Sequence, residues 1–478
     1  MKKTGDEYFD SDEFRELLTT YEEAVGTGQP VFLDADELSE IADYYQMNGR
    51  AEEASEAIDM ALSLSPGSIM PLTYKIHEAL YNHKVDEAED YLSQIIDTSD
   101  PDYLYDKVEI MLAKGQADAA DKMLQELLEE LPEEEKQDFI VDIANIFQEN
   151  NHNQKALAWI ERAHAEDTAD FKELRGRILF DMGNHEEGTR LFNELIDQDP
   201  FCKRYWSTLA SMHFIKEEYD DAIQSSEYAL AIDPQDAEGL IIKANALFKL
   251  ENFEKAAEFY KRYEEVIPND DFALLHYGTC LCNLGRTDEG IDKLRHAASL
   301  VKSAPYTEKA QSPYINDIYE ELAFRLLDSG LADEALACLD QTDTLSCDHV
   351  LMTTVKGHVL LASNRTVEAE EMYRQAIAMS ENPADAFLRV AVSIYDNHYV
   401  KAAYRMLETY FRISSPDNND GYAYMALCCY DLKRQKEFLK YLKEACRRNP
   451  QECKLVLGHL FPDELSPEDY FDYIVGNS

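Results

Sequence analysis

The apolar positions of the chain come in pairs of stretches, each with the spacing of one helix face. Trp206, Leu209 and His213 form one stretch, and Ala222 and Ala229 belong to the next, which follows after a short polar turn. Proline cannot continue a helix, and it follows the second stretch of several units. These prolines are Pro66, Pro132, Pro200, Pro234, Pro268 and Pro450. The pattern predicts a repeating unit of helix, turn and helix.

The unit recurs every 34 residues in the centre of the chain, where small residues mark two fixed places. The first place holds Gly176, Ala210, Ala244 and Gly278, and the second holds Gly188, Ala222, Ala256 and Gly290. Further out, the first place holds Ala42, Ala144, Ala323, Gly357, Ala391 and Ala426, with the larger Ile76 and Val108 in the second and third units. Packed helices approach closely only where facing side chains are small. One pair cannot cover its own apolar face, so we expect the pairs to stack into an all-α solenoid.

The clearest unit resembles the tetratricopeptide repeat. The matching residues are Trp206, Leu209, Ala210, Tyr219, Ala222, Ala229 and Pro234. The resemblance covers roughly residues 35–452, and the chain is similar to bacterial cytoplasmic multi-repeat proteins of this family. It implies a right-handed superhelical α-solenoid of about twelve repeats. Basic residues replace the expected leucine at Lys75, Lys107, Arg175, Lys243 and Lys356, and we interpret them as variation whose stems pack while the charge reaches solvent.

The predicted organisation follows the repeats and one long step between them. Residues 1–34 are expected to form an N-terminal capping helix, 35–302 repeats one to eight, 316–452 repeats nine to twelve, and 453–478 a C-terminal capping segment. The step from Gly290 to Ala335 is 45 residues instead of 34. Its extra residues, 303–315, form either a longer helix and loop or a hinge.

Composition narrows the classes of partner. The net charge of −50, from 95 acidic and 45 basic residues, disfavours nucleic acid and anionic membranes. A basic protein partner fits this charge, and so does a role in solubility alone. Nine cysteines without framework spacing, and no apolar leader or long apolar run, predict reduced thiols in the cytoplasm.

The motifs of the sequence predict neither an enzyme, a cofactor nor a metal site. Gly183 and Gly188 have the spacing of a phosphate loop, but the Lys-Ser/Thr that such a loop requires is missing. Cys280 and Cys282 are two apart on a predicted helix and point in nearly opposite directions, so they cannot chelate one ion. Acidic residues open many first helices, where the helix dipole explains them, although they could also form an acidic groove rim.

The resemblance places ligands in a concave groove lined by the first helix of each repeat. The candidate residues are Tyr105, Asn145, Arg177, Phe180, Arg204, Phe214, Asn245 and Phe248, followed by Thr279, Phe324, His358 and Tyr395. The two asparagines could hydrogen-bond the backbone of an extended peptide. The three phenylalanines up to residue 248 form either an aromatic ladder in the groove or ordinary packing.

Two of these candidates suggest a more specific contact. Arg177 and Arg204 lie on adjacent first helices and could together receive a carboxylate. Alternatively, Glu173 and Asp181 could satisfy Arg177 from its own helix. The sequence thus favours a scaffold that binds a protein or peptide segment in the groove. The alternative is a structural solenoid that self-associates, and the oligomeric state stays open.

Overall fold

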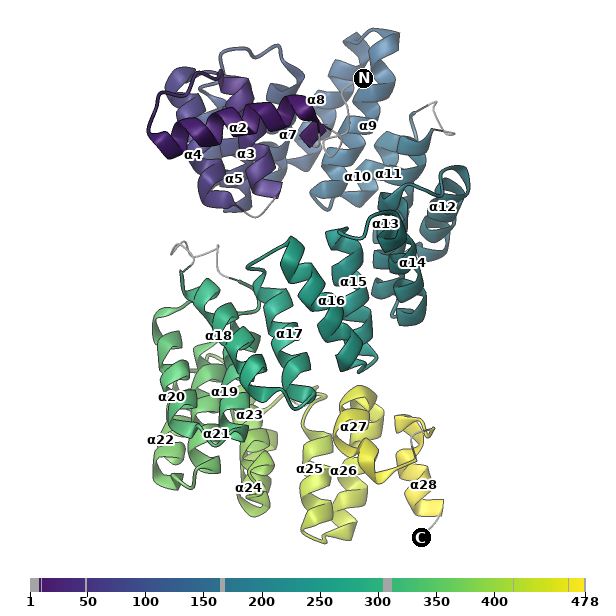
Figure 1. Ribbon diagram of the computed structural model, residues 1–478. Helices are drawn as coiled ribbons and strands as arrows, with labels where there is room; N and C mark the ends of the chain where they lie inside the picture. Colours follow the sequence, from purple (N-terminus) through teal and green to yellow (C-terminus); the bar gives the residue numbers. More distant parts are fainter. Residues whose placement is uncertain are drawn as a thin grey trace. The chain divides into compact units, whose positions relative to one another are not determined.

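The structure is a computed structural model that describes residues 8–9, 11–47, 50–163, 168–303, 312–415, 417–462 and 464–476. The described residues form helices and turns and contain no strand, so the predicted all-α solenoid is confirmed (Figure 1). They fall into two compact units that divide between Cys280 and Leu281. Most of the predicted insertion, residues 304–311, lies outside the described residues. None of the described helices is long and apolar enough to cross a membrane.

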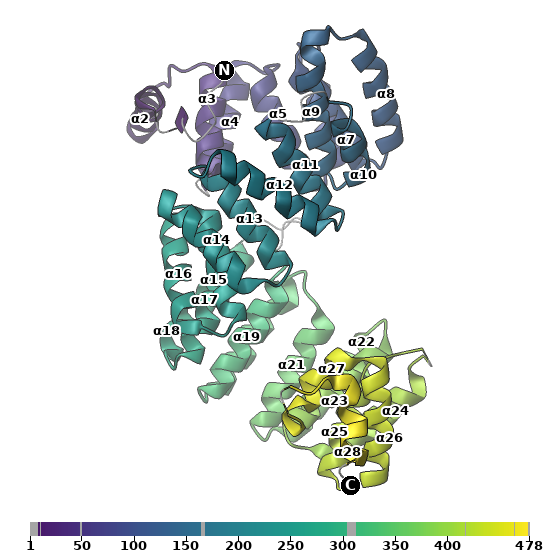
Figure 2. The same cartoon turned by 90° about the vertical axis from the view of Figure 1, so that its right-hand side faces the viewer.

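The first unit is a series of helix pairs in the predicted order (Figure 2). A leading helix, α2 (Asp12–Thr27), comes before them. The pairs are α3 (Ala35–Met47) with α4 (Ala51–Leu64), α5 (Ile69–Tyr81) with α6 (Val85–Leu92), α7 (Pro101–Ala113) with α8 (Ala117–Glu130), α9 (Glu133–Glu149) with α10 (Asn153–Ile160), α11 (Ala169–Asp181) with α12 (His185–Gln198), α13 (Lys203–Ile215) with α14 (Tyr219–Ile232), and α15 (Ala237–Lys249) with α16 (Phe253–Val266). The division between the units falls within the next helix, α17 (Asp271–Asn283).

The second unit continues the same architecture. After the last residues of α17 it contains α18 (Thr287–Ser303), and it ends with α27 (Pro450–Leu457), the short 3-10 turns Gly458–Leu460 and Pro467–Asp469, and α28 (Tyr470–Gly476). Between them lie the pairs α19 (Ile315–Asp328) with α20 (Ala332–Asp340), α21 (His349–Ala362) with α22 (Thr366–Met379), α23 (Pro383–Asp396) with α24 (Val400–Ile413), and α25 (Tyr422–Asp431) with α26 (Gln435–Arg448). The 3-10 turn Gln341–Thr344 follows α20.

The turn inside a helix pair has one residue in the left-handed region, wherever the structure describes that turn in full. Gly115 and Gly183 supply it with φ values of 72° and 85°, which glycine adopts without strain. Other pairs use a non-glycine residue at the same point, for example Asn151 at 61° and Glu251 at 56°. The tight turn therefore survives where the sequence has no glycine to mark it.

The small residues lie where two helices of a pair approach, as predicted. Gly188 on α12 faces Gly176 on α11 so closely that a Cβ atom on Gly188 would lie 2.8 Å from the Gly176 carbonyl oxygen. Ala210 and Ala222 occupy the matching places in the next pair and are fully buried. Close backbone approach is therefore what the 34-residue pattern encodes.

The ends of the repeat series are covered by additional helices. Phe14 and Tyr21 of α2 are buried in the same core cluster as Leu38 and Ile41 of α3. At the other end, the rings of Phe461 and Tyr470 stack with centroids 3.8 Å apart and complete the core beside α25 and α26. The N-terminal α2 and the C-terminal segment that contains Phe461 and Tyr470 therefore bury apolar surface that a terminal repeat would otherwise expose.

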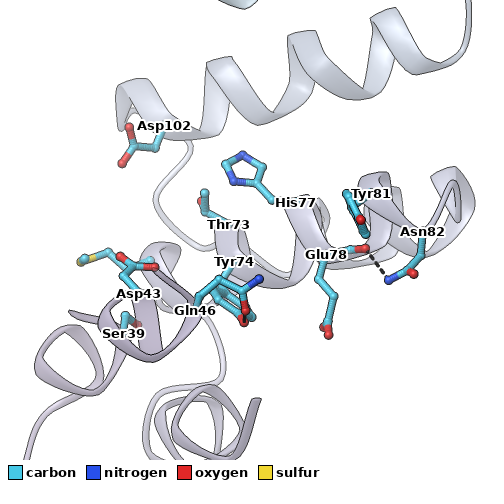
Figure 3. Close-up of a pocket in the computed structure, with 11 residues that line it drawn as sticks. Ser39, Asp43, Gln46, Thr73, Tyr74, His77, Glu78, Tyr81, Asn82 and Asp102 are labelled. Carbon is cyan, nitrogen blue, oxygen red and sulfur yellow. Dashed lines mark hydrogen bonds between the residues drawn. The ribbon is translucent and has the colours of Figure 1, made fainter. Parts of the chain in front are cut away.

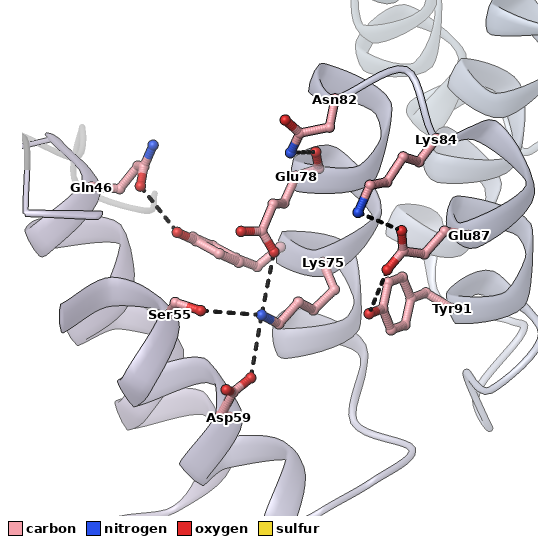
Figure 4. Close-up of polar contacts among 10 residues, drawn as sticks. Gln46, Ser55, Asp59, Lys75, Glu78, Asn82, Lys84, Glu87 and Tyr91 are labelled. Atoms are coloured by element: carbon pink, nitrogen blue, oxygen red, sulfur yellow. Dashed lines mark hydrogen bonds and ion pairs between the residues drawn. The ribbon is translucent and has the colours of Figure 1, made fainter. Parts of the chain in front are cut away.

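Three of the basic residues at leucine places form ion pairs between neighbouring repeats. Lys75 lies 3.2 Å from Asp59 and is also close to Glu78 and Ser55 (Figure 4). Lys243 pairs with Glu227 at 2.8 Å, and Lys356 with Asp340 at 3.0 Å. In each case, the carboxylate is on the second helix of the preceding repeat, 16 residues earlier in the chain. These lysines thus do more than reach solvent, because they join one repeat to the next.

Candidate functional site

A row of first-helix residues makes contacts from one repeat to the next. The row occupies the position directly after the first small place and comprises Asp43, His77, Glu109, Asn145, Arg177, Ser211, Asn245, Thr279, Phe324, His358, Val392 and Leu427. The Nε2 atom of His77 lies 3.3 Å from Oε2 of Glu109, and Arg177 donates to Oδ1 of Asn145 at 3.4 Å. In the second unit, the rings of Phe324 and His358 lie 5.1 Å apart. Equivalent positions in neighbouring repeats are therefore adjacent, and we call this set the first-helix row.

The predicted carboxylate site of Arg177 and Arg204 is partly occupied by the protein itself. Nη2 of Arg204 lies 2.7 Å from Oε2 of the buried Glu173. Burial raises the pKa of Glu173, although the two arginines act in the opposite direction. Asp181 accepts from Gln148 at 2.8 Å, and Nε of Arg177 is buried without a hydrogen-bond partner among the described residues. Glu173 therefore fills the place that was expected for a ligand carboxylate on Arg204.

The polar candidates also have partners within the protein. Tyr105 donates to Asp142 at 2.7 Å, and burial together with this bond raises the pKa of the Tyr105 hydroxyl. Asn145 donates to Glu149 at 2.7 Å and accepts from Arg177, so both ends of its amide are engaged. Asn245 accepts from Tyr260 at 2.6 Å through Oδ1. Among the described residues, its Nδ2 atom has no hydrogen bond, so Asn245 is the asparagine with a donor available for a peptide.

The predicted aromatic ladder is a set of pairs within the repeats. Each phenylalanine at the end of a first helix contacts an aromatic ring five residues later, at the start of the second helix. The ring-centroid distances are 4.4 Å for Phe180 with His185, 5.6 Å for Phe214 with Tyr219 and 5.7 Å for Phe248 with Phe253. Phe180 is 4% exposed and cannot contact a ligand in this structure, whereas Phe214 and Phe248 are half-buried. The packing interpretation describes these rings better than the groove ladder does.

A pocket of about 720 Å³ lies on first helices of the first unit (Figure 3). Its walls come from α3, α5 and the start of α7. Tyr74 and Tyr81 contribute aromatic surface, and Tyr81 is 83% exposed. Tyr74 also donates to Gln46 at 3.0 Å, which links α5 to α3 at the edge of the pocket.

The pocket carries an excess of negative charge. Asp43, Glu78 and Asp102 line it, and the lining residues include neither lysine nor arginine. Glu78 is paired with Lys75 at 3.2 Å. Asp43 has no hydrogen bond or ion pair to any residue that the structure describes, and burial raises the pKa of its carboxyl. Asp43 is exposed to solvent, so a cation that entered the pocket could reach its carboxylate directly.

A second pocket, of about 310 Å³, lies on first helices of the second unit. Leu351, Val355 and Leu388 give it an apolar floor, and the predicted candidates Phe324 and His358 also line it. Its rim carries Glu320 and Asp396, whose pKa values are raised by burial. Both units therefore combine a concavity on first helices with carboxylates that line it.

The sequence did not single out the residues of the first pocket. Asp43 and His77 belong to the first-helix row. The repeat pattern is weaker there, because the second and third repeats have the larger Ile76 and Val108 at the first small place and are 32 residues apart instead of 34. The repeat register could have identified them, because residues directly after the first small place lie on the face that lines both pockets. Applied to the early repeats, it would have selected Asp43, His77 and Glu109.

Two family models match parts of the chain. The tetratricopeptide repeat model matches residues 173–237, and the model of anaphase-promoting complex, cyclosome, subunit 3 matches residues 215–297. Together with the helix pairs at a 34-residue step, the first match defines the class. The chain is a tetratricopeptide-repeat protein.

Similar curated proteins share a limited part of their length with this chain. Protein O-mannosyl-transferase TMTC3 of Homo sapiens is 27% identical over 206 residues, which is 40% of this chain and 22% of that protein. The Hsp70-Hsp90 organizing protein of Triticum aestivum is 23% identical over 142 residues, which is 29% of this chain and 24% of that protein. The chain thus spans about a quarter or less of these relatives.

Solved structures also match over part of the chain. YrrB, a TPR protein with an unusual peptide-binding site, is 21% identical, with a TM-score of 0.34 over 43% of this chain and 97% of that chain. MamA is 19% identical, with a TM-score of 0.31 over 35% of this chain and 91% of that chain.

Proposed function

We propose that the protein is a non-catalytic scaffold that binds an extended, basic peptide segment on the first-helix faces of its repeats. Proteins of the tetratricopeptide-repeat class typically serve as scaffolds for other proteins. The pocket on α3, α5 and α7 is the site that we assign to a lysine or arginine side chain of the partner. Asp43 is the observation that carries this proposal, because its carboxylate lines a concave site and makes no hydrogen bond or ion pair with any described residue.

The chemistry of the pocket suits a long cationic side chain. An arginine or lysine has an apolar stem, which Tyr74 and Tyr81 can cover, and a charged head that Asp43 can bind. The charge of His77 is balanced by Asp106 and Glu109, which lie 3.2 Å and 3.3 Å from its Nε2 atom. The net charge of −50 adds long-range attraction for a basic segment and repulsion for an acidic one.

Fluorescence anisotropy with two labelled peptides tests the proposal. One peptide alternates arginine with alanine, and the other alternates glutamate with alanine at the same length. We expect the protein to bind the first and not the second. Because a hydrogen bond to a charged group contributes about 1.5–3 kcal/mol, the variant Asp43→Asn should weaken binding about tenfold or more.

The matched control is Asp36→Asn, which removes one negative charge from the same helix outside the pocket lining. This variant should bind nearly as well as the wild type. Equal binding of the two peptides would contradict the preference for a basic partner. Equal affinities of Asp43→Asn and Asp36→Asn for the arginine peptide would show that the peptide does not bind in this pocket.

A further inference from the structure

Three metal-ligating side chains meet at the edge of the pocket, from two neighbouring repeats. The Nε2 atom of His77 on α5 lies 3.2 Å from Oδ1 of Asp106 and 3.3 Å from Oε2 of Glu109, both on α7. The three ligand atoms all lie within 4.8 Å of one another. The side chain of Asp106 is 1% exposed, that of Glu109 20% and that of His77 54%, so the cluster has a buried side and an open side.

These spacings suit a small tetrahedral ion. Zinc binds imidazole nitrogen and carboxylate oxygen at about 2.0–2.2 Å. In a tetrahedron with such bonds, neighbouring ligand atoms are about 3.3–3.6 Å apart. The two distances from His77 are already close to this range. A small movement of the partly exposed Glu109 would bring its carboxylate oxygen to the same spacing from the other two ligand atoms.

The buried carboxylate of Asp106 has no lysine or arginine partner among the described residues. Its Oδ2 atom accepts from the Thr73 hydroxyl at 2.7 Å, which leaves Oδ1 directed at His77. A hydrogen bond of this kind orients a metal ligand from behind. A buried carboxylate also requires a nearby cation, and His77 can supply that charge only while it is protonated. The hydrogen bonds to Asp106 and Glu109 raise the pKa of His77 to about 10.

A second cluster with similar ligands shows the contrast. His213, Glu218 and Asp221 also lie within 4.8 Å of one another. There, however, Nζ of Lys216 is 2.7 Å from Oε1 of Glu218, so a lysine already provides the positive charge. The two clusters differ because a lysine lies beside the carboxylate Glu218 of the second cluster, whereas Asp106 in the first cluster has no lysine or arginine partner among the described residues.

We propose that His77, Asp106 and Glu109 bind a divalent transition-metal ion of the Zn²⁺ or Co²⁺ type, with the fourth position open to the pocket. One imidazole and two carboxylates suit such ions, whereas Mg²⁺ and Ca²⁺ prefer oxygen ligands alone. The ion replaces the proton on Nε2, and this proton is released to solvent. Bound there, the ion joins α5 to α7 and thereby fixes two neighbouring repeats. This site does not depend on peptide binding.

An ion held by these three side chains should also affect the stability of the fold. The acidic groups that face His77 are Asp43 from α3 and Asp106 and Glu109 from α7. The ion takes the place of the proton on Nε2 and binds beside these carboxylates. It should also stabilise the folded protein, by an amount that grows with the logarithm of the free metal concentration once this exceeds Kd.

Visible spectroscopy of the full chain with Co²⁺ tests the site. The protein is first freed of metal with EDTA, and Co²⁺ is then added in the presence of excess Mg²⁺, which saturates surface carboxylates. Four-coordinate Co²⁺ absorbs more strongly in the visible than six-coordinate Co²⁺. We expect one four-coordinate ion per chain in the wild type and none in His77→Gln or Glu109→Gln. His213→Gln is the matched control and should keep the signal. Zn²⁺ should raise the thermal midpoint of the wild type but not of His77→Gln.

Three results would overturn the proposal. The first is the absence of a four-coordinate spectrum in the wild type, and the second is an equal spectrum in His77→Gln and Glu109→Gln. The third is a sulfur-to-cobalt charge-transfer band, which would place the ion on cysteine. Circular dichroism of both variants checks that they fold, and His77 is exposed enough for glutamine to be accommodated.

Discussion

Gly188 is a residue at which a single added atom should disturb the packing of a repeat. A Cβ atom there would lie 2.8 Å from the carbonyl oxygen of Gly176 and 2.9 Å from Cβ of Phe180. Backbone cannot move aside as a flexible side chain can. We therefore expect Gly188→Ala to destabilise the protein by about 1–3 kcal/mol, as overpacking does. The thermal midpoint, followed by circular dichroism, measures the effect.

Gly26 on α2 provides the control for this substitution. An added Cβ would meet no atom within 4 Å there, and alanine is a better helix former than glycine. Gly26→Ala should leave the midpoint unchanged or raise it. If Gly188→Ala behaved in the same way, the two helices would approach less closely than the structure indicates.

At the scale of the element, Lys243 joins α15 to the preceding α14. The side chain is nearly buried, its Nζ atom lies 2.8 Å from Glu227, and it also lies 4.2 Å from the centroid of the Phe259 ring. Lys243→Met keeps the apolar stem and should cost no more than about 1 kcal/mol. Lys243→Glu should cost about 3 kcal/mol or more, because it places a second carboxylate beside Glu227 in a nearly buried position.

Urea unfolding of both variants measures this difference. Adding Glu227→Lys to Lys243→Glu restores a pair of opposite charges and should recover part of the lost stability. Equal losses for the methionine and glutamate variants would mean that the charge of Lys243 has no role in joining the repeats.

The same elements show how far the sequence could predict the structure. The helix pairs and their order followed from the 34-residue step, because small residues are required wherever two backbones meet, as at Gly176 and Gly188. The burial of Phe180 could not be predicted from the repeat pattern, because it depends on the stacking of this ring on His185, five residues later. The link from Lys75 to Asp59 was also missed, because it depends on how one repeat stacks on the next.

At the scale of the whole molecule, the charge dominates. An excess of 50 negative charges makes the folded chain repel itself, and this repulsion weakens as salt shortens the screening length from about 10 Å at 0.1 M to about 3 Å at 1 M. Salt also weakens the exposed ion pairs, but each of these contributes only about 0–1 kcal/mol. The net effect of screening should therefore favour the folded state.

We accordingly expect sodium chloride to act in opposite directions on stability and on binding. Between about 0.1 M and 1 M salt, the thermal midpoint should rise while the affinity for the arginine peptide falls, because the same screening removes both self-repulsion and attraction. Thermal scans and anisotropy titrations in the same buffers measure the two trends. A midpoint that falls with salt would show that the ion pairs between repeats, such as Lys243 with Glu227, outweigh the repulsion of the excess charge.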